Sequence, residues 1–208
     1  MTVIICPGAH EPKFTESCWQ SLVQQQPDLD QALVFPSHTQ PAFSAFHLLH
    51  FLQQRLISQS NPTPGAAAPL TFLSFSAGVV GAIGAALTWR QWGGQVQALI
   101  ALDGWGVPLL GDFPIHRASH DAFTHWSSAL LGAGQDSFYA DPPVAHLDLW
   151  RSPHTVSGWW VRKTGNGDDV RSLTTAAVFL ATLLTQYETP FQLSPTGWNE
   201  KRRQKLHS

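Results

Sequence analysis

The amino-acid sequence predicts an α/β fold, a three-layer sandwich with a mostly parallel central sheet of about five to six strands. Short, largely apolar runs alternate along the chain with longer segments in which apolar residues recur at helical spacing. Runs without polar alternation are typical of parallel strands that are buried on both faces. With 208 residues, 43% of them hydrophobic, the chain can bury one sizeable core. We therefore expect a single domain over residues 1–190.

The first elements are two strand–helix pairs. The β-branched run at residues 3–6 ends at the turn signal Pro7-Gly8, so it is expected to be a strand. A helix follows over residues 15–26, where apolar side chains recur at helical spacing and a proline stands after the last residue. Residues 32–35 are expected to form the second strand, and residues 42–58 a helix with a continuous apolar stripe.

The middle of the chain gives a third strand at residues 70–75 and a helix at residues 77–91 that is rich in glycine and alanine. Gly93-Gly94 is a helix-stop signal. The run QALIAL at residues 97–102 is expected to be the fourth strand.

The second half is less regular. Residues 104–142 are rich in Gly, Pro, His and aromatic residues, and we expect a loop or cap-like insertion with one helix around residues 119–131. Residues 146–150 alternate polar and apolar side chains, which predicts the last strand. A closing helix is expected over residues 173–187, followed by a tail at residues 191–208 that is basic at its end.

Charge argues against several classes of partner. Only 12% of the residues are charged and the formal net charge is −2, so the body of the protein is poorly suited to bind a polyanion. Four of the twelve Lys and Arg residues lie in the last nine positions, at residues 200–208. No nucleic-acid-binding motif accompanies this basic segment, so we expect no nucleic-acid partner.

The sequence also argues against export and membrane insertion. The first residues have no basic region and only a short apolar run, unlike a signal peptide. Residues 66–87 are uncharged, but their residue pattern changes at Ser76 from a strand-like run to a helical run of small residues. We therefore expect no membrane span. Cys6 and Cys18 are then interpreted as reduced core thiols of a cytoplasmic protein.

The residues around the third strand carry a recognisable motif. The run TFLSFSAG at residues 71–78 consists of a strand, a small-x-Ser-x-Gly sequence centred on Ser76, and the start of a helix. This resembles the nucleophile elbow of the α/β-hydrolase superfamily, in which a serine on a sharp turn joins strand to helix. Ser74 stands where the family pattern has glycine. The resemblance implies an α/β-hydrolase-like fold with Ser76 as nucleophile.

The same resemblance implies an oxyanion hole made of two backbone N–H groups. One would come from Ala77, the residue after the serine. The other would come from the loop after the first strand, where the Ala9 amide is the nominated donor. Two such donors stabilise the negative charge that develops on a carbonyl oxygen under attack.

The superfamily places its acid and then its histidine after the serine in the chain. His154, just after the expected last strand, is therefore the predicted base. His120 and His125 are its rivals and are otherwise expected to line the pocket. Their spacing of five residues does not put both on one helix face, so no metal site is expected. His10 precedes the serine and is expected to line the site.

For the acid, Asp103 ends the fourth strand directly after an apolar run and can orient an imidazole from there. Most superfamily members place the acid one strand later, so Asp121 and Asp148 stay open as alternatives. Asp141 precedes two prolines and is interpreted as a turn residue.

These residues predict a cofactor-independent serine hydrolase that cleaves an ester or thioester with an apolar acyl or aryl group. Trp105 and Trp126 are expected in the substrate pocket, in the charge-poor stretch at residues 104–161. No glycine-rich dinucleotide loop is found, so no cofactor is expected. The alternative is a hydrolase-fold protein without catalysis that acts as a binding or assembly factor. Weak homo-oligomerisation stays open.

Overall fold

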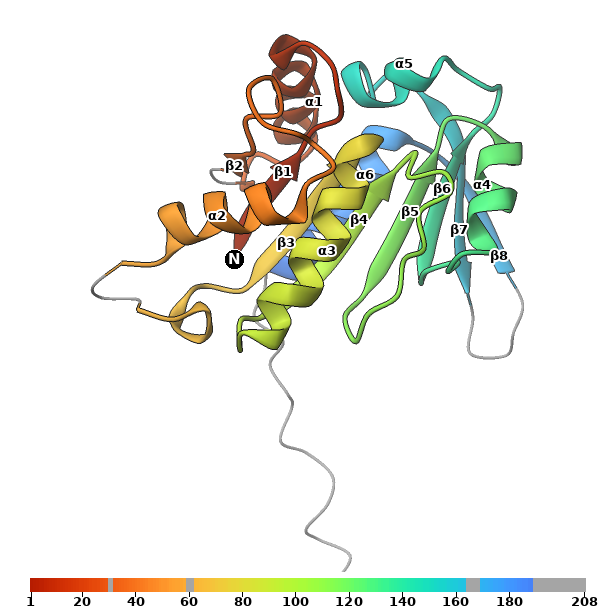
Figure 1. Ribbon diagram of the computed structural model, residues 1–208. Helices are drawn as coiled ribbons and strands as arrows, with labels where there is room; N and C mark the ends of the chain where they lie inside the picture. Colours follow the sequence, from red (N-terminus) through yellow and green to blue (C-terminus); the bar gives the residue numbers. More distant parts are fainter. Residues whose placement is uncertain (30–31, 59–61, 164–168, 189–208) are drawn as a thin grey trace, which may run out of the picture.

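The computed structural model describes residues 1–29, 32–58, 62–163 and 169–188, and it has an α/β fold built on one eight-stranded sheet (Figure 1). The strands are β1 (Thr2–Cys6), β2 (Ala32–Val34), β3 (Leu70–Phe75), β4 (Val96–Leu102), β5 (Ile115–Ser119), β6 (Asp136–Ala140), β7 (Ser157–Lys163) and β8 (Asp169–Thr175). The helices are α1 (Pro12–Gln25), α2 (Ala45–Leu56), the 3-10 turn η1 (Pro64–Ala66), α3 (Ala77–Gln91), α4 (Ala122–Ala129), α5 (His146–Arg151) and α6 (Ala176–Glu188).

The sheet is mixed but mostly parallel. Its strand order is β2-β1-β3-β4-β5-β6-β7-β8. All pairs from β2 to β6 are parallel, whereas β7 pairs antiparallel with both β6 and β8. The sheet therefore has more strands than the five to six expected, because the second half of the chain adds four.

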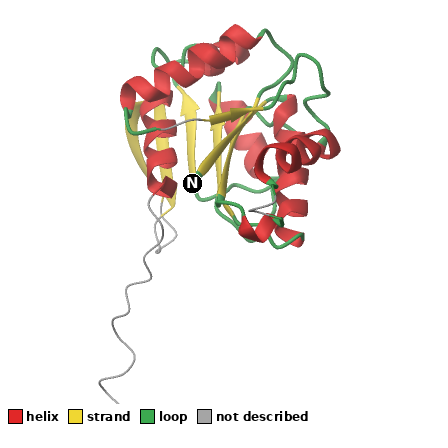
Figure 2. Ribbon diagram, turned by 90° about the vertical axis from the view of Figure 1, so that its left-hand side faces the viewer, coloured by secondary structure: helices red, strands yellow, loops and turns green. Residues whose placement is uncertain are grey.

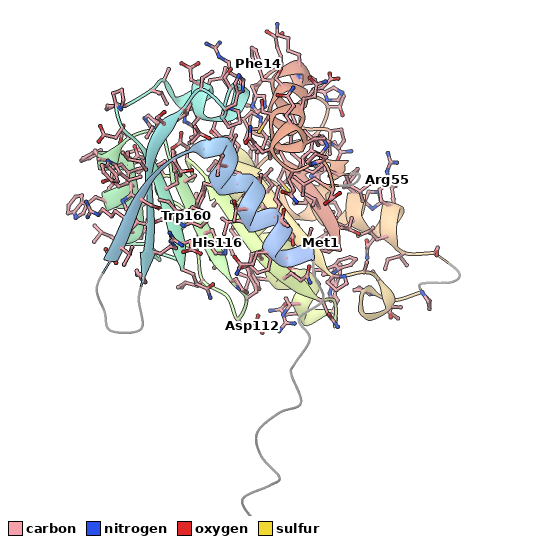
Figure 3. All side chains as sticks on the ribbon, turned by 180° about the vertical axis from the view of Figure 1, so that it is seen from behind. Met1, Phe14, Arg55, Asp112, His116 and Trp160 are labelled. Atoms are coloured by element: carbon pink, nitrogen blue, oxygen red, sulfur yellow. The ribbon has the colours of Figure 1, made fainter. Side chains whose placement is uncertain are left out.

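Helices cover both faces of the sheet, which gives the three layers that the sequence predicted (Figure 2). One core lies between the sheet and α2 and α3, and it includes Ile4, Phe72 and Leu99. The other lies between the sheet and α1, α5 and α6. Figure 3 shows α6 crossing this second face, where its Tyr187 bonds His116 and its Phe179 packs against Trp160.

The central strands form where the sequence predicted them because their side chains are buried on both sides. Every residue of β3 is buried, and so are six of the seven residues of β4. The expected helix at residues 77–91 coincides with α3. The uncharged stretch at residues 66–87 is thus divided between a strand and a helix. Over the residues that the structure describes, no helix combines the length and hydropathy needed to span a membrane.

The prediction of a loop or cap-like insertion at residues 104–142 is wrong in part. Two core strands, β5 and β6, lie in this segment beside the expected helix, which is α4. The strands carry polar side chains that are nevertheless buried, among them His116, Arg117 and Ser137. Each of these groups finds a hydrogen-bond partner inside the protein, so burial costs it little.

Two further expectations near the end of the chain are corrected. Residues 146–150 form a turn and a half of helix, α5, and not a strand, because the neighbouring Leu149 and Trp150 are both buried in the same core. A strand would point these two side chains to opposite faces. Residues 173–175 end β8, so the closing helix begins at Ala176. The expected tail at residues 191–208 lies outside the described residues.

The cysteines are as expected. Cys6 and Cys18 are buried and free of any disulfide. Burial raises the pKa of both thiols far above the ordinary range, so neither is a reactive thiolate.

Candidate active site

Ser76 lies on a sharp turn between β3 and α3. Its backbone has φ 53° and ψ −124°, a conformation that non-glycine residues rarely adopt. The Ser76 N–H donates to Leu102 O at 2.9 Å, which fixes the turn to the end of β4. Its hydroxyl makes no capping bond to α3. The turn therefore presents the hydroxyl at the carboxyl edge of the sheet.

Small residues on both sides allow this turn. A Cβ on Gly78 would lie 2.2 Å from Cys6 O and 2.6 Å from Pro7 O, so only glycine lets α3 approach the end of β1. On the other side, the Ser74 hydroxyl is buried and donates to Ile100 O at 3.1 Å. The hydrogen bond to the neighbouring strand explains how serine fits where the elbow pattern has glycine.

The loop after β1 lies against the turn. A Cβ on Gly8 would be 3.0 Å from the Ser76 Cβ, and Ser37 Oγ donates to Gly8 O at 3.1 Å, which holds the loop in place. Ala77 is the first residue of α3, where N–H groups have no partner within the helix. The assignment of the Ala77 and Ala9 amides as oxyanion donors stays a prediction.

Asp103 occupies the corresponding place after β4, the next strand in the sheet. It is a non-glycine residue with φ 50°, and its side chain is 1% exposed. The carboxylate accepts from the His120 backbone N–H at 2.9 Å. Its Oδ2 lies 3.0 Å from His120 Nδ1 and 2.8 Å from His146 Nδ1. One buried carboxylate thus orients two imidazoles.

His146 is the first residue of α5 and reaches the site from a different side. Its ring stacks on Phe75, the last residue of β3, with centroids 4.7 Å apart and planes at 25°. With Nδ1 held by Asp103, its Nε2 is the ring nitrogen that has no hydrogen-bond partner in the part of the chain that the structure describes. Among the described residues no hydrogen bond joins His146 to the Ser76 hydroxyl, but both side chains line one cavity.

His120 lies between two carboxylates. Besides its contact with Asp103, its Nε2 is 3.0 Å from Asp121 Oδ2. Asp121 also caps α4, because its Oδ1 accepts from Thr124 N–H. The pKa of Asp121 is lowered by hydrogen bonds from Thr124 and by His120, which outweigh its partial burial. Asp121 therefore contacts His120 and Thr124, which line the cavity, but is not itself one of its lining residues.

The cavity has a volume of about 370 Å³ and is lined by residues from five segments. Its lining residues are Ser76, Ala77, Val80, Asp103, Trp105, Val107, His120, Thr124 and His146. The Trp105 indole N–H donates to Ser127 Oγ at 3.1 Å, so the loop after β4 is fastened to α4. The walls are apolar, whereas the reactive side chains gather at one end of the sheet.

A buried arginine holds the loops that form one wall. Arg117 on β5 is 3% exposed, and its guanidinium donates to the backbone carbonyls of Val107 at 3.1 Å, Leu131 at 3.2 Å and Gly132 at 2.5 Å. Burial lowers its pKa to about 10. These carbonyls belong to the loops before β5 and after α4, so Arg117 positions the Trp105 loop.

The structure does not bring the predicted base, His154, to Ser76. Its Nδ1 is 3.0 Å from Ser21 Oγ on α1, and it does not line the cavity. The prediction counted from a strand at residues 146–150, which is helix α5, so the position after that segment no longer marks the strand edge. His146, at the start of the helix, takes the place beside Asp103.

His10 lies close to the site residues but outside the cavity. Its Nε2 lies 3.0 Å from Thr15 Oγ1, and its ring packs against Phe75 and Trp150. Burial and the nearby charge of His146 lower the pKa of His10. It does not line the cavity with Ser76.

The remaining candidates lie elsewhere. His125 and Trp126 line a separate cavity over β6–β8, where His125 Nε2 is 2.9 Å from Ser137 Oγ. Asp148 pairs with Arg151 at 2.7 Å, and Asp141 Oδ2 accepts from the Trp159 indole at 2.9 Å.

His146 is the residue that the sequence prediction missed. The signal that could have found it is the run DSFYA at residues 136–140, which contains two aromatic residues and is followed by Asp141 and two prolines. Once that run is recognised as the last parallel strand, His146 is the first histidine after it.

Comparison with known proteins adds no relative: the chain matches no protein-family model and no curated protein.

Proposed function

We propose that the protein is a serine hydrolase of the α/β-hydrolase type that cleaves an ester or thioester with an apolar acyl or aryl group. One observation carries the proposal: Ser76, on a strained strand–helix turn, shares a cavity with His146, whose Nδ1 is held by the buried Asp103. Nucleophile, base and orienting carboxylate are thus present at one edge of the sheet.

In the reaction that this arrangement supports, the Ser76 hydroxyl attacks the acyl carbon while His146 Nε2 accepts its proton. Asp103 keeps the proton on Nδ1 and stabilises the imidazolium. The protonated His146 then donates to the leaving alkoxide or thiolate, which leaves an acyl ester on Ser76. Water attacks this ester with His146 as base, which releases the acid and restores the serine. The Ala77 N–H is the expected donor to the oxyanion.

The chain order supports the assignment. Ser76, Asp103 and His146 follow β3, β4 and β6, in the order nucleophile, acid, histidine of the superfamily that the elbow resembles. Among the described residues no hydrogen bond joins Ser76 to His146, and catalytic hydrogen bonds of this kind often shorten only when substrate binds.

The cavity favours an uncharged substrate. Val80, Trp105 and Val107 contribute apolar walls, and no Lys or Arg is found among the described lining residues. A carboxylate or phosphate near the scissile bond would therefore lack a cationic partner beside the buried Asp103. A cavity of about 370 Å³ is at the small end of ligand sites, which suits a short acyl or aryl group.

Hydrolysis of para-nitrophenyl acetate, butyrate and octanoate by the full chain tests the proposal. We expect turnover that Ser76→Ala abolishes and that His146→Gln lowers at least about 100-fold, the usual contribution of a general base. His154→Gln is the matched control and should keep wild-type turnover. Turnover that survives Ser76→Ala would refute Ser76 as the nucleophile, and no turnover with any of the three esters would favour the alternative of a binding or assembly factor without catalysis.

A further inference from the structure

Three metal-ligating atoms converge beside the proposed nucleophile. One ligand atom each from Asp103, His120 and His146 lies within 4.8 Å of the other two. The carboxylate oxygen is 3.0 Å from one nitrogen and 2.8 Å from the other. The three side chains come from the ends of β4 and β5 and from the start of α5, so the fold itself assembles the group.

We propose that these three side chains bind a divalent transition-metal ion, with Zn²⁺ as the best fit, and that the bound ion blocks the hydrolase. Two imidazole nitrogens and one carboxylate oxygen, with the fourth position left to water, form a donor set that zinc accepts. Mg²⁺ and Ca²⁺ prefer sites made of oxygen ligands, so they should bind poorly.

The spacing is close to that of a zinc site. Zinc bonds of about 2.0–2.2 Å in tetrahedral geometry place neighbouring ligand atoms roughly 3.3 Å apart. The two nitrogen–oxygen distances of 3.0 and 2.8 Å would each have to open by a few tenths of an ångström, and the two histidine nitrogens, which lie within 4.8 Å of each other, would have to reach the same spacing. Rotation of the two histidine rings can make this change, because both are partly exposed to the cavity whereas Asp103 is fixed.

The surroundings also suit a metal. His120 Nε2, the nitrogen that would face away from the ion, lies 3.0 Å from Asp121 Oδ2. A carboxylate behind a ligating histidine fixes the ring and makes it a better ligand. The His146 side chain is 47% exposed and the His120 side chain 24%, so an ion can enter from the cavity.

The expected inhibition rests on the proposed function. A metal on Nδ1 of His146 takes the electron pair of that nitrogen, so the neutral ring must carry its proton on Nε2. His146 then has no free nitrogen to accept the Ser76 proton, and Asp103 is engaged by the ion. His146 and Asp103 can therefore either bind zinc or support transfer of the Ser76 proton, but they cannot do both at once.

Isothermal titration of the metal-free full chain with ZnCl₂ tests the site without reference to activity. We expect a saturable site that His120→Gln weakens at least tenfold and that His125→Gln, in the separate cavity over β6–β8, leaves unchanged. Asp103→Asn should also weaken it. If His120→Gln binds Zn²⁺ as tightly as the wild type, or no saturable binding occurs, the site is refuted. Mg²⁺ in place of Zn²⁺ should give no comparable heat.

Para-nitrophenyl ester hydrolysis at rising Zn²⁺ then separates the two proposals. Loss of turnover in proportion to site occupancy, reversed by EDTA, supports both. Zinc binding without any esterase activity at zero metal refutes the hydrolase but leaves the site intact. Turnover that is unaffected or raised by a saturated His120-dependent site refutes the inhibitory role.

Discussion

The strained turn at Ser76 predicts that the nucleophile destabilises the fold. A non-glycine residue in such a sparsely populated backbone region costs about 1–3 kcal/mol. Ser76 has φ 53° and ψ −124°. Ser76→Gly removes the Cβ and most of this strain, but glycine gains about 0.5–1 kcal/mol of backbone entropy in the unfolded chain. The free energy of unfolding should therefore rise by about 1 kcal/mol at the middle of these ranges, and by about 2.5 kcal/mol at most.

Ser76→Ala is the matched control, because it removes the hydroxyl and keeps the strained Cβ. Urea denaturation of the three proteins should give wild type and Ser76→Ala nearly equal, with Ser76→Gly more stable. For a domain of 150–250 residues each kcal/mol raises Tm by about 2–4 °C, so thermal unfolding should detect the difference. If Ser76→Gly is no more stable than Ser76→Ala, the argument from strain is refuted.

Three other substitutions test parts of the account. Arg117→Met leaves buried carbonyls without donors and should lower the unfolding free energy by about 3 kcal/mol. Arg90→Met, at an exposed ion pair, should change it little. Equal effects of the two substitutions in denaturation would contradict the role of Arg117 in holding the loops. Gly78→Ala forces a Cβ against Cys6 O, so it should lower the free energy of unfolding by about 1–3 kcal/mol and remove most of the esterase activity. Unchanged stability and activity would show that the turn at Ser76 is not tightly packed. Burial lowers the pKa of His116 below the ordinary imidazole value of about 6.5. The unfolded chain then binds the proton more readily, so stability should fall as pH drops through that range, and His116→Gln should flatten this dependence; an unchanged slope between pH 7.5 and 5.5 would count against it.

The sequence predicts the fold best where the strands are continuous apolar runs. Strands β1, β3 and β4 are apolar runs bounded by turn residues, and their positions agree with the prediction. Strand β5, IHRAS, could not be predicted because its pattern is polar. Arg117 is satisfied by carbonyls of distant loops and His116 by Tyr187 on α6. Such partners depend on tertiary structure, so no local pattern reveals that this strand is buried.

The candidate site residues are likewise predictable where they follow apolar strands and not where they depend on tertiary contacts. Ser76 and Asp103 can be proposed from the sequence because each directly follows an apolar strand that is readily recognised. The base was assigned to His154 because residues 146–150 mimic a strand, whereas the structure holds that histidine against Ser21. The double use of Asp103 by His120 and His146 could not be predicted, since it depends on where α5 begins relative to the sheet.

Covalent labelling of the full chain with a fluorophosphonate, followed by peptide mass spectrometry, tests the central claim most directly. We expect one adduct at Ser76, formed in the folded protein, strongly slowed in Asp103→Asn and His146→Gln, and unaffected in His154→Gln. A folded wild-type protein in which Ser76 stays unlabelled would contradict it, and so would labelling of Ser76 that proceeds equally fast without His146.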